Sequence, residues 1–169
     1  DRQYRLPIWV LYIDWFDKKT YGNPEFLLKP DLVSKNDFIL YGKRKFCAMV
    51  FSNPTQQRVD TYNLFSTYKK VDGFGKPFGN WTNGESVKYN NLKKYKFSVC
   101  YENRLYPGYY TEKLFHAKTA GNVPIYYCDD QVSNDFNEKC FINMNNYESL
   151  DHLLEYVKEV DKNDKLYSS

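Results

Sequence analysis

One continuous apolar run, FCAMVF at residues 46–51, constrains the fold of this chain more than any other feature. Six consecutive apolar residues cannot alternate between a core and water, so the run predicts a strand buried on both sides. Such strands belong to parallel sheets covered by helices on both faces. A helix is predicted over residues 54–68, with Asn53 as its cap and Pro54 in its first turn. Apolar residues recur there at helical spacing, at Val59, Tyr62, Phe65 and Tyr68.

The alternation of strand and helix patterns continues to the end of the chain. Further strands are predicted at residues 70–72, 97–101, 123–127 and 141–143, and further helices at 86–95, 111–120 and from about 149 onward. Alternating strands and helices imply parallel strands joined by crossovers. We therefore predict a Rossmann-like α/β domain over residues 45–169. Residues 1–44 are expected to form an irregular segment that packs on this main body.

Composition narrows the function classes. The chain has 169 residues and a net charge of +3 from 24 basic and 21 acidic residues, without the concentrated basic surface typical of nucleic-acid binders. An RNA-binding domain would gather lysines and aromatic residues on strands, and it is disfavoured because the aromatics here are scattered and the cations lie at helix starts. Aromatic residues make up 19% of the chain; this content suits a sugar- or base-binding surface and equally a lineage that favours Tyr.

The four cysteines, Cys47, Cys100, Cys128 and Cys140, are widely spaced and contain no CxxC pair. This spacing predicts neither a zinc site nor a disulfide framework. Cys47 and Cys100 lie inside apolar strand runs, where a free cysteine acts as a small hydrophobic residue.

The first junction of interest follows the strand at 46–51. Ligands of open α/β sheets bind where strands end and helices begin. Ser52 and Asn53 lie at such a point, and Arg58 follows in the first turns of the helix. An Arg there can form two parallel hydrogen bonds with a phosphate. A solvated Arg without a ligand is the open alternative.

The second junction, residues 101–113, is richer in polar residues. A buried strand ends near Glu102, a Pro-Gly turn follows, and Thr111 can cap the next helix. The free N–H groups at a helix start favour an anion. Lys113 lies in this first turn, where a cation opposes the helix dipole unless an anion is bound. Glu112 is either a carboxylate that suits the dipole or a group that faces a sugar.

The segment YENRLYPGYYTEKL, residues 101–114, resembles the donor-binding signature of the α-1,3/4-fucosyltransferases, glycosyltransferase family 10. That signature is an aromatic residue, Glu-Asn, a short variable loop, then Tyr, one residue and Thr-Glu-Lys. The resemblance continues in AGNVPI at residues 120–125 and in FCAMVFSNP at 46–54, and it covers nearly the whole chain.

The resemblance implies a GT-B architecture, in which two Rossmann-like domains flank the active site and this chain is the C-terminal half. It also implies transfer of fucose from GDP-fucose, with inversion, to a GlcNAc-containing glycan such as N-acetyllactosamine. Neither a cofactor nor a metal is expected, because two cations and a helix terminus can stabilise the leaving group. The absence of an Asp-x-Asp motif agrees with this expectation.

The resemblance also assigns roles to individual residues. Arg58 and Lys113 would hold the diphosphate and neutralise the leaving GDP, and Glu112 would contact fucose near its ring. The nucleotide-sugar pocket would further include Asn103 and Tyr109, with Ser52 and Asn53 as weaker candidates.

The general base of the family is a Glu in the N-terminal acceptor domain, so none is assigned in this chain. We expect the isolated domain to bind GDP-fucose but to transfer fucose poorly or not at all. Two alternatives remain open: a non-catalytic nucleotide-sugar-binding module, and a transferase of another nucleotide sugar. The compartment also stays open, because members of the family occur in the bacterial cytoplasm and, membrane-anchored, in the Golgi lumen.

Overall fold

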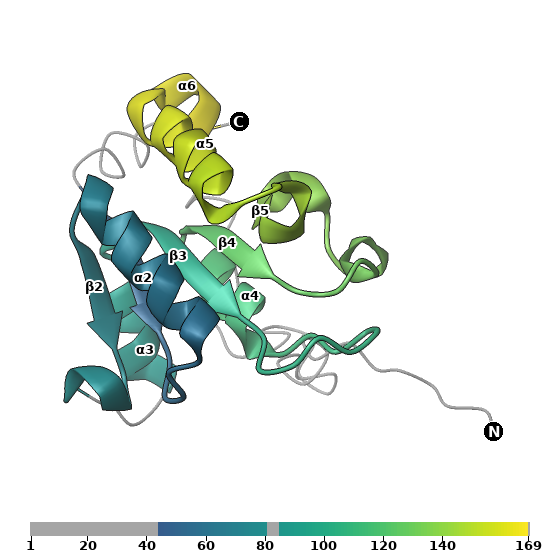
Figure 1. Cartoon of the computed structure of the whole chain (residues 1–169), viewed down its shortest axis with the longest axis horizontal. Coiled ribbons are helices and arrows are strands. Elements are labelled where there is room, and N and C mark those ends of the chain that lie inside the picture. Colours follow the sequence, from purple (N-terminus) through teal and green to yellow (C-terminus); the bar gives the residue numbers. More distant parts are fainter. Residues whose placement is uncertain (1–43, 81–84, 169) are drawn as a thin grey trace, which may run out of the picture.

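The computed structural model describes residues 44–80 and 85–168, in which five strands form one sheet (Figure 1). Every strand pairing is parallel, and the strand order is β2-β1-β3-β4-β5. The strands are β1 (Lys45–Val50), β2 (Val71–Phe74), β3 (Tyr95–Tyr101), β4 (Val123–Tyr127) and β5 (Ile142–Asn143). The helices are α2 (Gln56–Tyr68), α3 (Glu85–Leu92), α4 (Glu112–Thr119), α5 (Leu150–Lys162) and α6 (Asp164–Tyr167). The predicted Rossmann-like domain is confirmed, whereas residues 1–43 of the predicted N-terminal segment lie outside the described residues.

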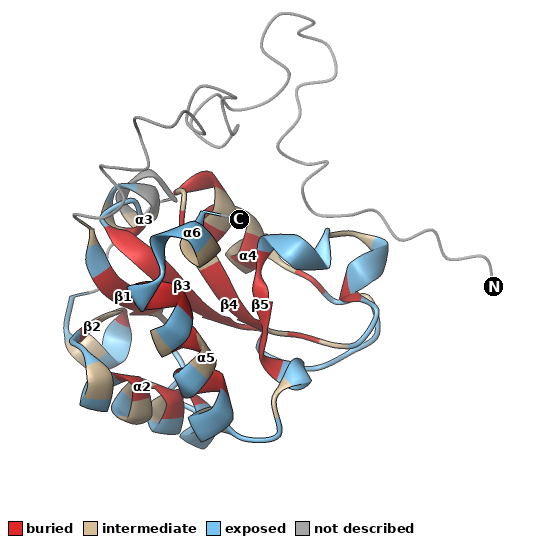
Figure 2. Ribbon diagram, turned by 90° about the horizontal axis from the view of Figure 1, so that it is seen from above, coloured by how far each residue is buried: buried red, intermediate tan, exposed pale blue. Residues whose placement is uncertain are grey.

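The helices cover both faces of the sheet, as the apolar run of β1 predicts. Helices α2 and α5 pack on one face, and α3 and α4 lie on the other (Figures 1 and 2). Phe65 of α2 and Val157 of α5 are fully buried against Phe97 of β3. On the opposite face, Leu114 of α4 packs with Tyr126 of β4. Apolar burial on both sides explains why the strands carry so few polar residues.

Most element boundaries differ from the prediction by one to three residues; for example, α3 ends at Leu92 rather than at residue 95. Helix α2 begins at Gln56 with Thr55 as its N-cap, two residues later than expected, because the Asn53 carbonyl accepts a hydrogen bond from the Thr55 amide at 3.0 Å. Strand β3 begins at Tyr95 rather than Phe97 and includes Lys96, which is 7% exposed. The sequence pattern missed this extension because a lysine seldom lies in a buried strand unless its charge is paired.

All four cysteines are free, and Cys47 and Cys100 are buried core residues as predicted. Within residues 44–80 and 85–168, no helix has both the length and the apolar character needed to cross a membrane. Over the same ranges, no three His, Cys, Asp or Glu side chains gather closely enough to hold a metal ion.

The strand order identifies where a ligand site belongs in this sheet. From β1 the chain crosses to β2 on one side, and from β2 it returns past β1 to β3 on the other side. The two successive crossovers therefore leave the sheet in opposite directions, which creates a topological switch point between β1 and β3. Ligands of doubly wound sheets bind outside the carboxyl ends of the strands at this point.

A buried carboxylate fixes α5 to the sheet. The Asp161 side chain, 2% exposed, accepts hydrogen bonds from Lys69 at 2.5 Å, Lys96 at 2.8 Å and Tyr68 at 3.0 Å. Lys96 also donates to the Asp161 carbonyl at 2.8 Å. Burial alone would raise the pKa of Asp161, but the hydrogen bonds from Lys69 and Lys96 outweigh it and lower the pKa.

We expect Asp161→Ala to lower the free energy of unfolding by about 3–5 kcal/mol, because it leaves the buried Lys96 ammonium without its counter-ion. Urea denaturation measures the change. The folded-state pKa of Asp161 is depressed, so its contribution is present above about pH 3.9 and is lost as pH falls further. The stability gap between wild type and variant should therefore narrow below that pH. Asp164→Ala, three residues later and exposed, is the control. An equal loss of stability in both variants would contradict the role of Asp161 as a buried counter-ion.

Candidate functional site

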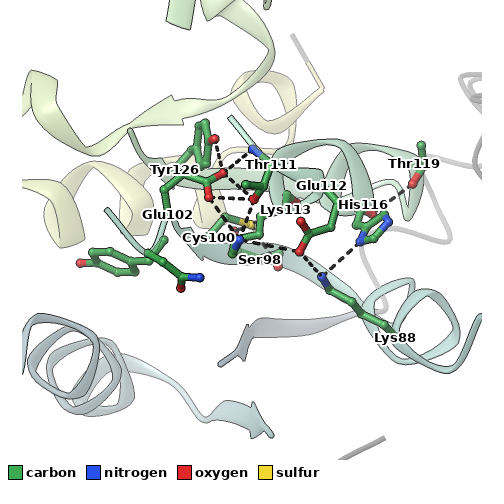
Figure 3. Close-up of polar contacts among 12 residues, drawn as sticks. Lys88, Ser98, Cys100, Glu102, Thr111, Glu112, Lys113, His116, Thr119 and Tyr126 are labelled. Atoms are coloured by element: carbon green, nitrogen blue, oxygen red, sulfur yellow. Dashed lines mark hydrogen bonds and ion pairs between the residues drawn. The ribbon is translucent and has the colours of Figure 1, made fainter. Parts of the chain in front are cut away.

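The candidate site is built around Glu102, the residue that follows β3. Its side chain is completely buried, and its main-chain amide extends the pairing of β3 with β4 by donating to the Tyr127 carbonyl at 3.2 Å. The Glu102 carboxylate accepts hydrogen bonds from four groups (Figure 3). These are the Thr111 amide at 2.9 Å, the Thr111 hydroxyl at 2.7 and 2.9 Å, the Tyr126 hydroxyl at 2.7 Å and the Lys113 ammonium at 3.1 Å.

These hydrogen bonds fix the start of α4 against the end of β3. Thr111 is the N-cap of α4, but its side chain bonds Glu102 instead of capping the helix. Burial, together with the neighbouring Glu102 carboxylate, raises the pKa of Tyr126 far above its usual range, so its hydroxyl stays protonated and donates. Glu102 is thus satisfied by donors from β4, from the cap of α4 and from the first turn of α4.

The loop between Glu102 and α4 has a second anchor. Asp129, which follows β4, accepts hydrogen bonds from the Gly108 amide at 3.2 Å and from the Tyr110 hydroxyl at 2.8 Å. Gly108 has φ of 74°, a left-handed conformation that favours glycine. Tyr110 is buried, whereas Tyr109 beside it is 41% exposed. The loop is therefore held by two carboxylates while Tyr109 stays accessible.

Lys113 lies between two carboxylates. Its ammonium is 2.6 Å from the Thr111 hydroxyl, 3.1 Å from Glu102 and 3.7 Å from Glu112. From the sequence, the position of Lys113 at a helix start indicates a bound anion, but in the structure its positive charge already has two carboxylate partners. A bound anion is not needed to explain a lysine at this helix start. The Lys113 side chain nevertheless keeps 19% of its surface exposed.

Glu112 and His116 extend the cluster along α4. Lys88 of α3 lies 3.8 Å from the Glu112 carboxylate and 3.1 Å from Nδ1 of His116 (Figure 3). Burial alone would raise the pKa of Glu112, but Lys113 and Lys88 outweigh it and lower the pKa. Burial and the Lys88 charge lower the pKa of His116 to about 4. At neutral pH, Glu112 is therefore ionised and His116 is neutral, so Nδ1 of His116 can accept a hydrogen bond from the Lys88 ammonium.

Arg58 is buried at the switch point and bridges the ends of β1 and β3. Its terminal nitrogens donate to the carbonyls of Asn53 at 3.0 Å and Tyr101 at 3.1 Å, and to Oδ1 of Asn103 at 2.8 Å. It also contacts the Glu102 carbonyl at 3.4 Å. Burial lowers the pKa of Arg58, and the negative charge of nearby Glu102 offsets part of this decrease. A solvated Arg58, the alternative left open by the sequence, is wrong, since only 4% of the residue is exposed.

The structure thus brings four of the predicted site residues to one strand end. Arg58 binds the main chain of Glu102 and the side chain of Asn103, while Lys113 binds the carboxylate of Glu102. Glu112 adjoins Lys113. Ser52 and Asn53 are exposed beside the start of α2, and Asn53 meets Arg58 through its carbonyl. Their roles in ligand binding stay predictions.

From the sequence, Glu102 receives no role of its own in the site. It is placed at the end of a strand and in the Glu-Asn of the family signature, but not as the partner of Lys113. Lys88 and His116 were also missed: they lie in sequence segments that carry no motif. A signal for Glu102 was nonetheless present. A lysine at a helix start needs a counter-charge, and Glu102 ends the neighbouring strand.

Comparison with known proteins assigns the chain to a family. Residues 40–169 match the model described as glycosyltransferase family 10 (fucosyltransferase), C-terminal part. The chain belongs to glycosyltransferase family 10. The family resemblance of residues 101–114 is thereby confirmed.

Individual members of family 10 align over most of this chain but over less than half of their own length. The human 4-galactosyl-N-acetylglucosaminide 3-alpha-L-fucosyltransferase 9 is 35% identical over 143 residues, which cover 81% of this chain and 40% of the relative. The alpha-(1,3)-fucosyltransferase FucT of Helicobacter pylori is 34% identical over 128 residues, 74% of this chain and 26% of the relative. A relative from Acanthamoeba polyphaga mimivirus is 34% identical, and the matching region covers 23% of that relative's length.

Solved structures of the family share this fold. A crystal structure of an α1,3-fucosyltransferase superposes with a TM-score of 0.70 at 31% identity, over 78% of this chain and 38% of that chain. A second crystal structure, of an α1,3-fucosyltransferase with GDP-fucose, gives a TM-score of 0.69 at the same identity. The described sheet is therefore the C-terminal Rossmann-like half of the GT-B fold of family 10.

We expect Tyr126→Phe to lower the free energy of unfolding by about 1.5–3 kcal/mol, because the buried Glu102 carboxylate loses one charge-assisted hydrogen bond. Urea denaturation measures this loss. Tyr127→Phe is a matched control, since its hydroxyl has no hydrogen-bond partner within the described part of the chain and its ring contact with Tyr101 is kept. A Tyr126→Phe protein as stable as this control would show that the hydrogen bond to Glu102 contributes nothing.

His116 should titrate near pH 4 in an NMR experiment that follows its imidazole signals. The unfolded chain takes up the same proton near pH 6.5, so the free energy of unfolding should fall as pH drops from about 6.5 towards 4. His116→Asn, which keeps an acceptor for Lys88, should flatten this slope. The other histidine of the chain, His152 of α5, is exposed and gives a second imidazole signal, which His116→Asn leaves in place. A His116 midpoint near 6.5 would contradict the burial argument.

Proposed function

We propose that this chain is the donor-binding domain of an α-1,3-fucosyltransferase that takes fucose from GDP-fucose and transfers it, with inversion, to a GlcNAc-containing glycan. The observation that carries the proposal is the Lys113 cluster, by which we mean Lys113 with Arg58, Lys88, Glu102 and Glu112. Its central residue, Lys113, is a partly exposed cation at the start of α4 that is held at the carboxyl end of β3, at the switch point. Membership of family 10 and the fold shared with a crystallised α1,3-fucosyltransferase bound to GDP-fucose support it.

Electrostatics favour a diphosphate at this position. Of the ionisable residues in the cluster, Arg58, Lys88 and Lys113 are cationic and Glu102 and Glu112 are anionic, which leaves an excess positive charge. The free N–H groups of α4 add a partial positive charge at the same place. Cationic groups fixed before the reaction stabilise charge that develops on a leaving group. Lys113 therefore neutralises the departing GDP, and no metal is required.

Arg58 and Glu112 have different roles in this proposal. Arg58 supports the diphosphate with its charge and holds Asn103, which lines the pocket with Tyr109, Ser52 and Asn53. A direct phosphate contact would require Arg58 to exchange one of its present oxygen partners. Glu112 is ionised and faces fucose, where its carboxylate bonds hydroxyls or stabilises positive charge at the anomeric carbon.

The general base and the remainder of the acceptor site require protein outside this chain. Family relatives are more than twice as long as the region that matches, and the proposed acceptor domain and general base belong to that further region. The human relative's name specifies a galactosyl-N-acetylglucosaminide acceptor. We propose the same class of acceptor here, with N-acetyllactosamine as its simplest form.

Calorimetric titration should show that GDP-fucose binds more tightly than GDP-mannose or UDP-galactose. We expect Lys113→Met to weaken GDP-fucose binding by about 1.5–3 kcal/mol, because a charge-assisted contact with the diphosphate is lost. Lys118→Met, on the same helix, should bind as tightly as wild type. Since Lys113→Met also unpairs Glu102, the double variant Glu102→Gln/Lys113→Met separates lost binding from lost stability. Unchanged GDP-fucose affinity in Lys113→Met would refute the diphosphate assignment.

A further inference from the structure

A hollow of about 320 Å³ lies beside the end of β4. Its lining residues come from the start of α2, the end of β4 and the segment that leads into α5: Gln57, Tyr127, Met144, Asn145, Tyr147, Ser149 and Leu150. Tyr127 belongs to the core on the α2 and α5 face, whereas its neighbour Tyr126 belongs to the core on the α4 face. The hollow and the α4 part of the cluster, Glu112 and Lys113, therefore lie at the same strand ends but on opposite faces of the sheet, whereas Arg58 of α2 lies on the side of the hollow.

Residues that line the hollow are linked through short contacts to residues that hold the proposed donor site. Gln57 precedes Arg58 on α2, and Arg58 reaches the carbonyls at the end of β3. The ring of Tyr127 contacts the ring of Tyr101 with centroids 5.2 Å apart, and the Tyr127 carbonyl accepts from the Glu102 amide. A ligand in the hollow thus lies beside the residues that hold the proposed donor site, without contacting Lys113 or Glu112.

The lining combines an apolar floor with amide and hydroxyl groups. Met144 is buried at 6% exposure, and Tyr127 and Tyr147 are half-buried. Gln57 is exposed, and its side-chain amide has no partner among the residues that the structure describes. The Asn145 amide nitrogen donates to the Cys128 carbonyl, which leaves its oxygen as an acceptor. Among residues 44–80 and 85–168, no lysine, arginine, aspartate or glutamate lines the hollow.

This chemistry fits a neutral hexose better than a nucleotide. A pyranose ring has an apolar face of C–H groups and a rim of hydroxyls, each of which donates and accepts. An aromatic wall matches the face, and amides match the hydroxyls because they too supply both donor and acceptor. A diphosphate would find no cation here, and the volume lies at the lower end of the range for small-molecule sites, enough for about one sugar ring.

We propose that this hollow is a subsite for one hexose of the acceptor glycan, with Gln57 and Asn145 as its hydrogen-bonding groups and Tyr127 as its aromatic wall. The inference rests on the proposed function, since it places the acceptor beside the donor at one sheet edge. It assigns acceptor contacts to the C-terminal half of the fold. The three residues would select the acceptor and play no part in binding GDP.

The two methionines of the chain give a direct test. Met144 lines the hollow, whereas Met49 is buried in β1 and does not line it. With ¹³C-methyl methionine in the whole 169-residue chain, titration with N-acetyllactosamine should shift the Met144 signal in a saturable way and leave the Met49 signal in place. In Gln57→Ala we expect the apparent Kd to rise at least about fivefold. Gln56→Ala is the matched control, because the Gln56 amide bonds Asp60 at 2.8 Å and lies outside the hollow.

GDP alone provides the second arm of the titration. Its affinity should be the same in wild type and Gln57→Ala, and it should not reproduce the Met144 shift. A Met144 signal that ignores the disaccharide, or that responds equally in both Gln variants, overturns the subsite while intact GDP binding leaves the proposed function standing. A Met144 shift with GDP alone would assign the hollow to the donor and also overturn the inference. Loss of GDP binding at Lys113→Met is measured separately, so the two proposals fail independently.

Discussion

A buried carboxylate at the end of β3 organises the functional edge of this domain. Glu102 is completely shielded from water, and it is tolerated there because four donor groups surround it. Burial of an unpaired carboxylate would be strongly unfavourable, so the donors and the acceptor fix one another. The position of Lys113, the start of α4 and the path of the loop before it all follow from this requirement.

The switch point between β1 and β3 then concentrates cations at one place. Arg58 joins the two strand ends through carbonyl oxygens and orients Asn103, while Lys113 approaches from α4. Both contact Glu102, one through its main chain and the other through its carboxylate. A parallel sheet places the carboxyl ends of all its strands at one edge, which brings residues 55 positions apart in sequence, Arg58 and Lys113, to the same residue, Glu102.

The two faces of the sheet edge differ in chemistry. The α3 and α4 face carries the charged Lys88, Glu112 and Lys113, whereas the hollow on the α2 and α5 face is lined by amides and aromatic rings, with Arg58 of α2 beside it. A transferase that joins an anionic donor to a neutral acceptor benefits from such a division. In the proposed arrangement, the donor and the acceptor would thus occupy chemically different sites at one sheet edge.

The sequence by itself determined the fold class and the two strand-end segments. Uninterrupted apolar runs have no periodicity that could face water, and the motif at 101–114 is a local pattern. Only the tertiary structure decided the partners of the charged residues. Glu102 with Tyr126, and Lys96 with Asp161, are pairs between elements distant in sequence or on separate strands, so no local spacing reveals them. Their chemistry depends on burial, which packing creates.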